Sequence, residues 1–160
     1  MPSMLTARQT QETDQTRTLA AVALAVALCL VGVRVILALL DRTELSTDEA
    51  QYWFWGQDLD FGAYSKPPLI GWIIRLSTDL FGQSVWAVRL PSVLIHALAA
   101  TVIYVFARRI APRPVPELAG LLYLLSPGVA LGSALMTTDT PLLLAAAVAL
   151  LAQWHLGLAN

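Results

Sequence analysis

The sequence has few charged residues, a single cysteine and no excess of basic residues. Only 13% of its 160 residues are charged, whereas 57% are hydrophobic, and the mean hydropathy is +0.64. A soluble domain of this length cannot bury that much apolar surface, so the composition argues against a soluble globular protein. The net charge of -1 provides no basic field for nucleic acid, and Cys29 lies inside an apolar run, where we expect it to pack as a small hydrophobe. The sequence therefore predicts an integral membrane protein with no nucleic-acid partner.

Four apolar runs are long enough, or nearly long enough, to cross a bilayer, which takes about 20 helical residues. We expect transmembrane spans at residues 19–40, 90–107, 118–135 and 142–158. The first contains one charge, Arg34, which we expect to snorkel or to pack in the bundle. The third contains Ser126-Pro127-Gly128, which predicts a kink whose freed backbone groups neighbouring helices must satisfy.

The spans define the domain organisation and the orientation. Residues 1–17 are expected to form a disordered cytoplasmic tail, and residues 18–160 a single all-α transmembrane domain with an outer loop at 41–88. Basic residues crowd the link between the second and third spans, which predicts that this link is cytoplasmic. With four spans, Asp48 and Asp139 then lie on the same, outer side of the membrane.

Two short helices are predicted in the outer loop. The Ser46-x-x-Glu49 spacing is typical of a capping box, and Pro67-Pro68 indicates the start of a second helix at 69–80. Arg75 and Asp79 fall four residues apart in that helix and are expected to pair. Because tryptophan, tyrosine and phenylalanine side chains cluster in this loop, we expect both helices to lie along the membrane interface.

Four short motifs follow one another along the chain: Thr47-Asp48-Glu49-Ala50-x-Tyr52, Tyr64-x-Lys66-Pro67-Pro68-Leu69, Val88-Arg89-Leu90-Pro91-Ser92 and Thr138-Asp139-Thr140-Pro141. This order resembles the amino-terminal part of the polytopic GT-C glycosyltransferases, specifically the bacterial relatives of the dolichyl-phosphate-mannose protein mannosyltransferases and of the lipid A aminoarabinose transferases. The resemblance covers roughly residues 19–158. Full-length relatives carry further spans, so the chain is expected to be an amino-terminal portion with little or no activity alone.

The resemblance implies transfer of a sugar from a polyprenyl-phosphate donor to a lipid, glycan or protein acceptor at the outer face of the membrane. In a bacterium this membrane would be the inner membrane. It implies Asp48 as the general base, with Glu49 beside it, and a donor phosphate held by Lys66 and Arg89. Asp139 would act as a supporting acid. Asp48, Glu49 and Asp139 together could hold a divalent metal, the one cofactor considered.

Each of these residues has a structural alternative. Glu49 can simply close the capping box, Asp48 suits the positive end of a helix dipole, and Asp139 or its neighbour can cap the fourth span. Lys66 can be a solvated interfacial lysine, and Arg89 can anchor lipid headgroups. The alternative functions are a non-catalytic membrane scaffold, which would tolerate alanine at Asp48 and Lys66, and a small transporter module, which would carry polar residues along its spans.

Overall fold

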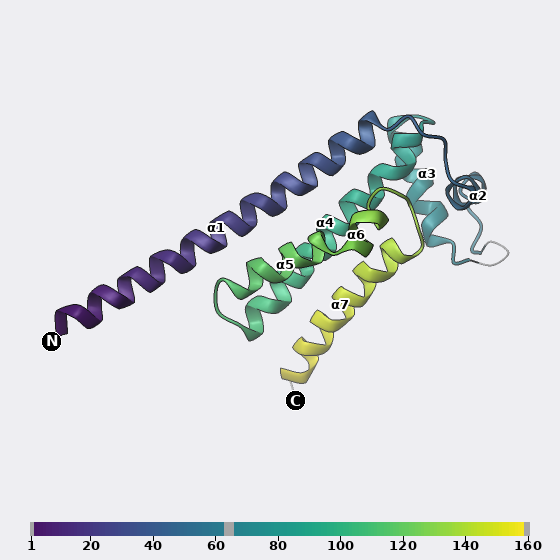
Figure 1. The fold of residues 1–160 in the computed structure, drawn as a ribbon. Coiled ribbons are helices and arrows are strands. Elements are labelled where there is room, and N and C mark those ends of the chain that lie inside the picture. The colour runs from purple at the N-terminus through teal and green to yellow at the C-terminus, as the bar shows by residue number, and fades with distance from the viewer. Residues whose placement is uncertain (1, 63–65, 159–160) are drawn as a thin grey trace.

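The computed structural model describes residues 2–62 and 66–158, and this part of the chain forms seven α-helices and no strand (Figure 1). The helices are α1 Pro2–Leu40, α2 Thr47–Trp55, α3 Leu69–Phe81, α4 Val85–Ile110, α5 Val115–Leu125, α6 Pro127–Gly132 and α7 Asp139–Leu158. The predicted all-α architecture is confirmed. The two short outer-loop helices are also present, as α2 and α3.

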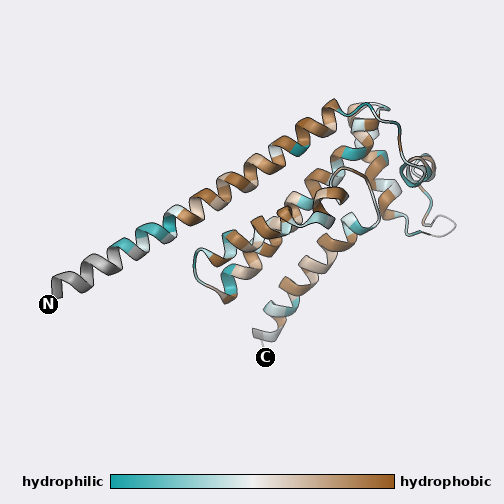
Figure 2. Cartoon of the chain, in the orientation of Figure 1, coloured by the Kyte–Doolittle hydropathy of each residue, from teal (hydrophilic) through white to brown (hydrophobic). Residues whose placement is uncertain are grey.

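The central helix of the bundle is α4, which packs against α1, α3, α5 and α7. In Figure 1, α2 and α3 lie at one end of the bundle, and the N-terminus, the α4–α5 link and the end of α7 lie at the other. Within the described part of the chain, three helical segments are long and apolar enough to cross a membrane: Thr13–Leu40, Val85–Ile110 and Asp139–Gly157. Figure 2 shows the same pattern, with hydrophobic colour along these helices and hydrophilic colour in the turns of α1 just before its apolar part. Multiple apolar helices therefore make this a multi-pass membrane protein.

Helix α1 starts well before the predicted first span. It begins at Pro2, so residues 2–17 continue the helix in place of the disordered tail that the sequence suggested. It ends at Leu40, where the sequence placed the end of the span. Cys29 is exposed along this helix rather than packed within the bundle.

The expected third span is divided into two helices. Helix α5 ends at Leu125 and α6 begins at Pro127, whose ring nitrogen cannot donate a hydrogen bond. The break frees the carbonyl of Leu124, and the Arg34 side chain of α1 donates to it from Nη2 at 2.6 Å. The predicted kink and its repair by a neighbouring helix are both present, and Arg34 faces the bundle.

A second proline is accommodated in the same way. The span predicted at 90–107 is longer in the structure, because α4 already begins at Val85 and continues through Pro91. Since Pro91 has no N–H, it leaves the carbonyl of Ala87 without its usual helical partner. The Ser77 hydroxyl of α3 donates to that carbonyl at 2.6 Å, which ties α3 to α4.

A small apolar core supports the α2–α3 end. It comprises Tyr52, Ile70, Ile74, Val88 and Met136, contributed by α2, α3, α4 and the segment before α7. Helices α2 and α3 approach closely at two glycines, and a Cβ atom placed on Gly56 would lie 2.6 Å from the carbonyl oxygen of Gly71. These contacts fix α2 relative to α4 and to the start of α7.

Candidate functional site

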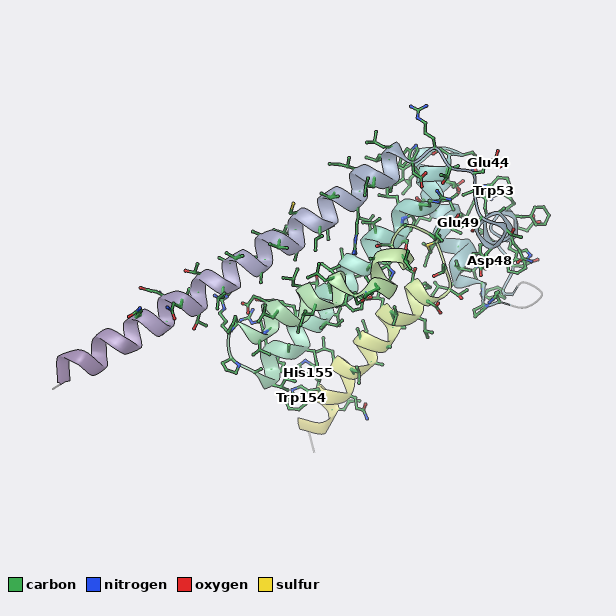
Figure 3. All side chains as sticks on the ribbon, in the orientation of Figure 1. Glu44, Asp48, Glu49, Trp53, Trp154 and His155 are labelled. Carbon is green, nitrogen blue, oxygen red and sulfur yellow. The ribbon has the colours of Figure 1, made fainter. Side chains whose placement is uncertain are left out.

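The two neighbouring acids of α2 have different environments. The Ser46 hydroxyl accepts a hydrogen bond from the Glu49 amide at 3.3 Å, and the Ser46 amide donates to Glu49 Oε2 at 2.9 Å. The predicted capping box is thereby confirmed. Successive residues of a helix point about 100° apart, since a turn takes 3.6 residues. Glu49 is consequently fully buried whereas Asp48 is exposed, and Figure 3 shows both at the α2 end of the molecule.

The buried Glu49 carboxylate is paired with Arg89 of α4. The guanidinium donates from Nε to Oε1 at 2.9 Å and from Nη2 to Oε2 at 2.8 Å, the two-point geometry that arginine forms with carboxylates. The Met136 amide adds a third donor, at 3.0 Å from Oε1. Glu49 therefore joins α2 to α4 and to the segment before α7.

The same Arg89 side chain holds the beginning of the outer loop. Its Nη1 donates to the Thr43 hydroxyl at 2.7 Å and forms an ion pair with the Asp41 carboxylate, and its Nη2 donates to the Glu44 carbonyl at 2.9 Å. All three nitrogens are thus engaged, and the residue is only 2% exposed. The sequence suggested Arg89 as a ligand of the donor phosphate; the structure places its guanidinium inside the protein, on Glu49 and the 41–44 segment.

Both acids on Arg89 are held in their ionised form. Burial alone would raise the pKa of Glu49, but the hydrogen bonds from Arg89 and from the Ser46 and Met136 amides outweigh it and hold that pKa below its usual value. The amide and hydroxyl of Thr43, and to a lesser degree Arg89, lower the pKa of Asp41. One arginine shared by two ionised carboxylates leaves this cluster with one excess negative charge.

Asp48 and Asp139 lie at the same end of the bundle, and both are close enough to the Tyr52 hydroxyl to act on it. Burial raises the pKa of Tyr52 most, the negative charges of Asp48 and Asp139 raise it further, and a hydrogen bond with the Thr138 side chain opposes them. A charge acts on another group in this way only at short range. We call Asp48, Tyr52, Thr138 and Asp139 the Asp48 face. Asp139 itself is exposed in the first turn of α7.

Lys66 stands at the start of the second described stretch, directly before Pro67. Its side chain is partly exposed, and it forms no ion pair with any side chain that the structure describes. Tyr64, the first residue of its motif, lies outside the described residues. Lys66 is therefore a cation of the outer loop that remains available for an anion, unlike Arg89.

The residues do not fit the divalent metal that the sequence suggested. Both oxygens of Glu49 are occupied by Arg89 and by backbone amides, which leaves two of the three expected carboxylates. Over the described ranges, no three acidic, histidine or cysteine side chains are grouped closely enough to hold a metal ion.

A polar network behind the Asp48 face was missed by the sequence reasoning. The Ser92 hydroxyl donates to the Gly132 carbonyl at 2.6 Å and lies 3.2 Å from the hydroxyl of Thr140, so it connects α4 to α6 and α7. His96 is buried one turn further along, with its Nδ1 2.9 Å from the Tyr123 hydroxyl, as expected for a packed histidine. Ser92 and Thr140 both belong to the four sequence motifs, and this shared membership was the only sign in the sequence that the two residues pair.

Comparisons with known proteins agree on one family. A family model described as "Dolichyl-phosphate-mannose-protein mannosyltransferase" matches residues 65–157. The lipid A galacturonosyltransferase RgtD of Rhizobium johnstonii is 45% identical over 124 residues, which are 77% of this chain and 26% of RgtD. The chain thus spans about a quarter of the length of this curated relative. No solved structure matches the chain.

Proposed function

Because the chain belongs to the dolichyl-phosphate-mannose-protein mannosyltransferase family of membrane glycosyltransferases, we propose that Asp48 is the general base of a sugar transfer from a polyprenyl-phosphate donor. In that role the Asp48 carboxylate takes the proton of an acceptor hydroxyl, whose oxygen forms a bond to the anomeric carbon of the sugar. The bond between that carbon and the phosphate oxygen breaks, and the polyprenyl phosphate leaves with the electron pair. Lys66 balances the charge of the phosphate.

One observation carries this proposal: of two adjacent acids, one is buried in an ion pair and the other is exposed and unpaired in the described part of the chain. Glu49 is fully buried against Arg89, whereas Asp48 is exposed one position earlier. A general base must come within about 2.6–3.2 Å of the proton it removes, which requires an exposed carboxylate. Glu49 already provides the structural acid at the start of α2, through the capping box, so Asp48 is not needed for that role.

The Asp48 face supplies further groups for an acceptor. Thr138 carries a partly exposed hydroxyl and Asp139 adds a second, exposed carboxylate, whereas Tyr52 is buried and holds the Thr138 side chain by a hydrogen bond. In this proposal Asp139 is the supporting acid of the site. Glu49 and Arg89, which the sequence considered as catalytic and phosphate-binding residues, instead fix the position of α2.

For the acceptor we favour a lipid hydroxyl, with lipid A as the example that RgtD supplies by name, and with galacturonic acid as the first sugar to test. An outer-loop site at the end of apolar helices lies at the depth of lipid headgroups. The Asp48 face would then be on the periplasmic side of a bacterial inner membrane, because the basic link between α4 and α5 is at the opposite end.

The test uses the full-length protein reconstituted in proteoliposomes with a radiolabelled polyprenyl-phosphate sugar. We expect Asp48→Asn to lower turnover by about 10²- to 10⁴-fold, the usual contribution of a general base, while photocrosslinking of the donor stays at the wild-type level. Lys66→Ala should instead weaken donor crosslinking. Asp58→Asn, another exposed acid of the same loop, is the matched control and should transfer normally. Wild-type turnover by Asp48→Asn would refute the assignment of the base, and a scaffold would tolerate both Asp48→Asn and Lys66→Ala.

A further inference from the structure

A crevice of about 520 Å³ lies between α1, α4 and α5, in the half of the bundle away from the Asp48 face. Its walls are largely apolar, and six of the sixteen lining residues are alanine or glycine. They include Ala20, Ala21, Ala27, Ala97, Ala100 and Gly120. Three charged residues also line it: Arg17 of α1, Arg113 of the α4–α5 link and Glu117 of α5. An apolar crevice with charges of both signs is unlike the purely apolar surface that faces lipid tails.

Glu117 is the unusual member of this group. Its side chain is only 5% exposed, and its Oε1 forms an ion pair with Arg113, at 3.1 Å from Nε. The other oxygen, Oε2, is buried and has no hydrogen-bond partner among the described residues. A buried carboxylate oxygen without a donor is unfavourable, so the site calls for an additional N–H or O–H group.

The two arginines, in contrast, provide hydrogen-bond donors for an anion. Arg113 uses Nε for Glu117 and is 57% exposed, so the terminal nitrogens of its guanidinium remain accessible. Arg17 is also exposed, on the facing wall of the crevice. Guanidinium groups bind phosphate well, because their planar N–H donors match its oxygens.

We propose that this crevice binds one phospholipid whose headgroup carries both a phosphate and a primary amine. The phosphate is bound by Arg17 and Arg113, the ammonium donates to Glu117 Oε2, and an acyl chain occupies the alanine-lined part of the crevice. The complementarity involves charges of both signs, which distinguishes this site from a basic patch that attracts any anionic lipid. A choline headgroup has the same charges but no N–H to donate, and a glycerol headgroup has no cation.

The test compares headgroups on the full-length protein in lipid nanodiscs that contain equal amounts of phosphatidylethanolamine and phosphatidylcholine. After extraction into mild detergent, native mass spectrometry counts the lipids that remain bound. We expect wild type to retain phosphatidylethanolamine over phosphatidylcholine by roughly tenfold, about what one charge-assisted hydrogen bond supplies. Equal retention of the two lipids, or retention of neither, would overturn the proposal, and this comparison needs no variant.

Three variants locate the site. Glu117→Gln should abolish the preference between the two lipids, whereas Arg113→Gln should weaken retention of both. Ala21→Trp fills the crevice from an exposed position of α1 and should prevent retention while leaving every charged group in place.

Asp14→Asn and Arg109→Gln, exposed residues outside the crevice, are the matched controls and should behave as wild type. A preference that survives Glu117→Gln would show that the ammonium binds elsewhere and would refute the site. Because sugar transfer is measured separately, this result is independent of the role of Asp48.

Discussion

Replacement of Arg89 by methionine should strongly destabilise the protein, because it would leave Glu49 as a buried charge without its partner. The wild-type carboxylate has a side chain that is 1% exposed and receives two hydrogen bonds from Arg89, in addition to the Ser46 and Met136 amides. Removal of one partner of a buried ion pair costs about 3–5 kcal/mol, far more than the loss of a surface pair. We expect a loss of that size in the free energy of unfolding.

The measurement is reversible unfolding of the full-length protein in mixed micelles, followed by tryptophan fluorescence. Arg75→Met in α3 is the matched control, since it removes a half-exposed pair with Asp79, which contributes at most about 1 kcal/mol, and one hydrogen bond to the Gln57 carbonyl, but strands no buried charge. The double variant Glu49→Gln/Arg89→Met contains no buried charge. It should therefore cost less than the sum of the two single changes, by about 1–3 kcal/mol. Strictly additive losses, or an Arg89→Met variant as stable as Arg75→Met, would refute this account of the pair.

Three further predictions concern stability, each measured by thermal unfolding of the full-length protein. The pKa of Glu49 is lower in the folded protein than its usual 4.5. The ionised carboxylate therefore stabilises the fold fully above pH 4.5, and this stabilisation is lost as the pH falls through the lowered pKa. Wild type should consequently lose stability in acid more steeply than Glu49→Gln. Gly56→Ala should cost about 1–3 kcal/mol because its Cβ would lie 2.6 Å from an α3 carbonyl oxygen, whereas Gly62→Ala, in open space, should cost little. Arg34→Met should cost about 1–3 kcal/mol by leaving the Leu124 carbonyl unpaired; wild-type stability would show that another group satisfies it.

The local features of the outer loop could be predicted from the sequence because they depend on residues three or four positions apart. The Ser46 capping box and the start of α3 after Pro67-Pro68 are both present. The Arg75–Asp79 pair also forms, with Arg75 Nε 2.8 Å from the Asp79 carboxylate. Each arises from contacts within one helix or at its first turn, which the sequence spacing already determines.

The partnership of Glu49 and Arg89 could not be predicted in the same way. The two residues are 40 positions apart, and each had a plausible local role, as a helix cap and as a headgroup anchor. Their contact depends on how α2 packs against α4, which no periodicity encodes. For the same reason the candidate site was predicted only in part: the grouping of Asp48 and Asp139 at one end followed from the order of the spans, whereas the burial of Glu49 and Arg89 did not.

The fixed position of Glu49 has a consequence for experiments on this family. Adjacent acids invite an alanine scan scored by product formation, and both positions would be expected to lose product. For Glu49 the loss would reflect a misplaced α2 and a weakened fold, since its carboxylate joins three parts of the chain. For Asp48 the fold should remain intact and only the reaction should fail. Protein yield and melting temperature, recorded beside activity, would therefore separate the two neighbours where turnover alone would group them.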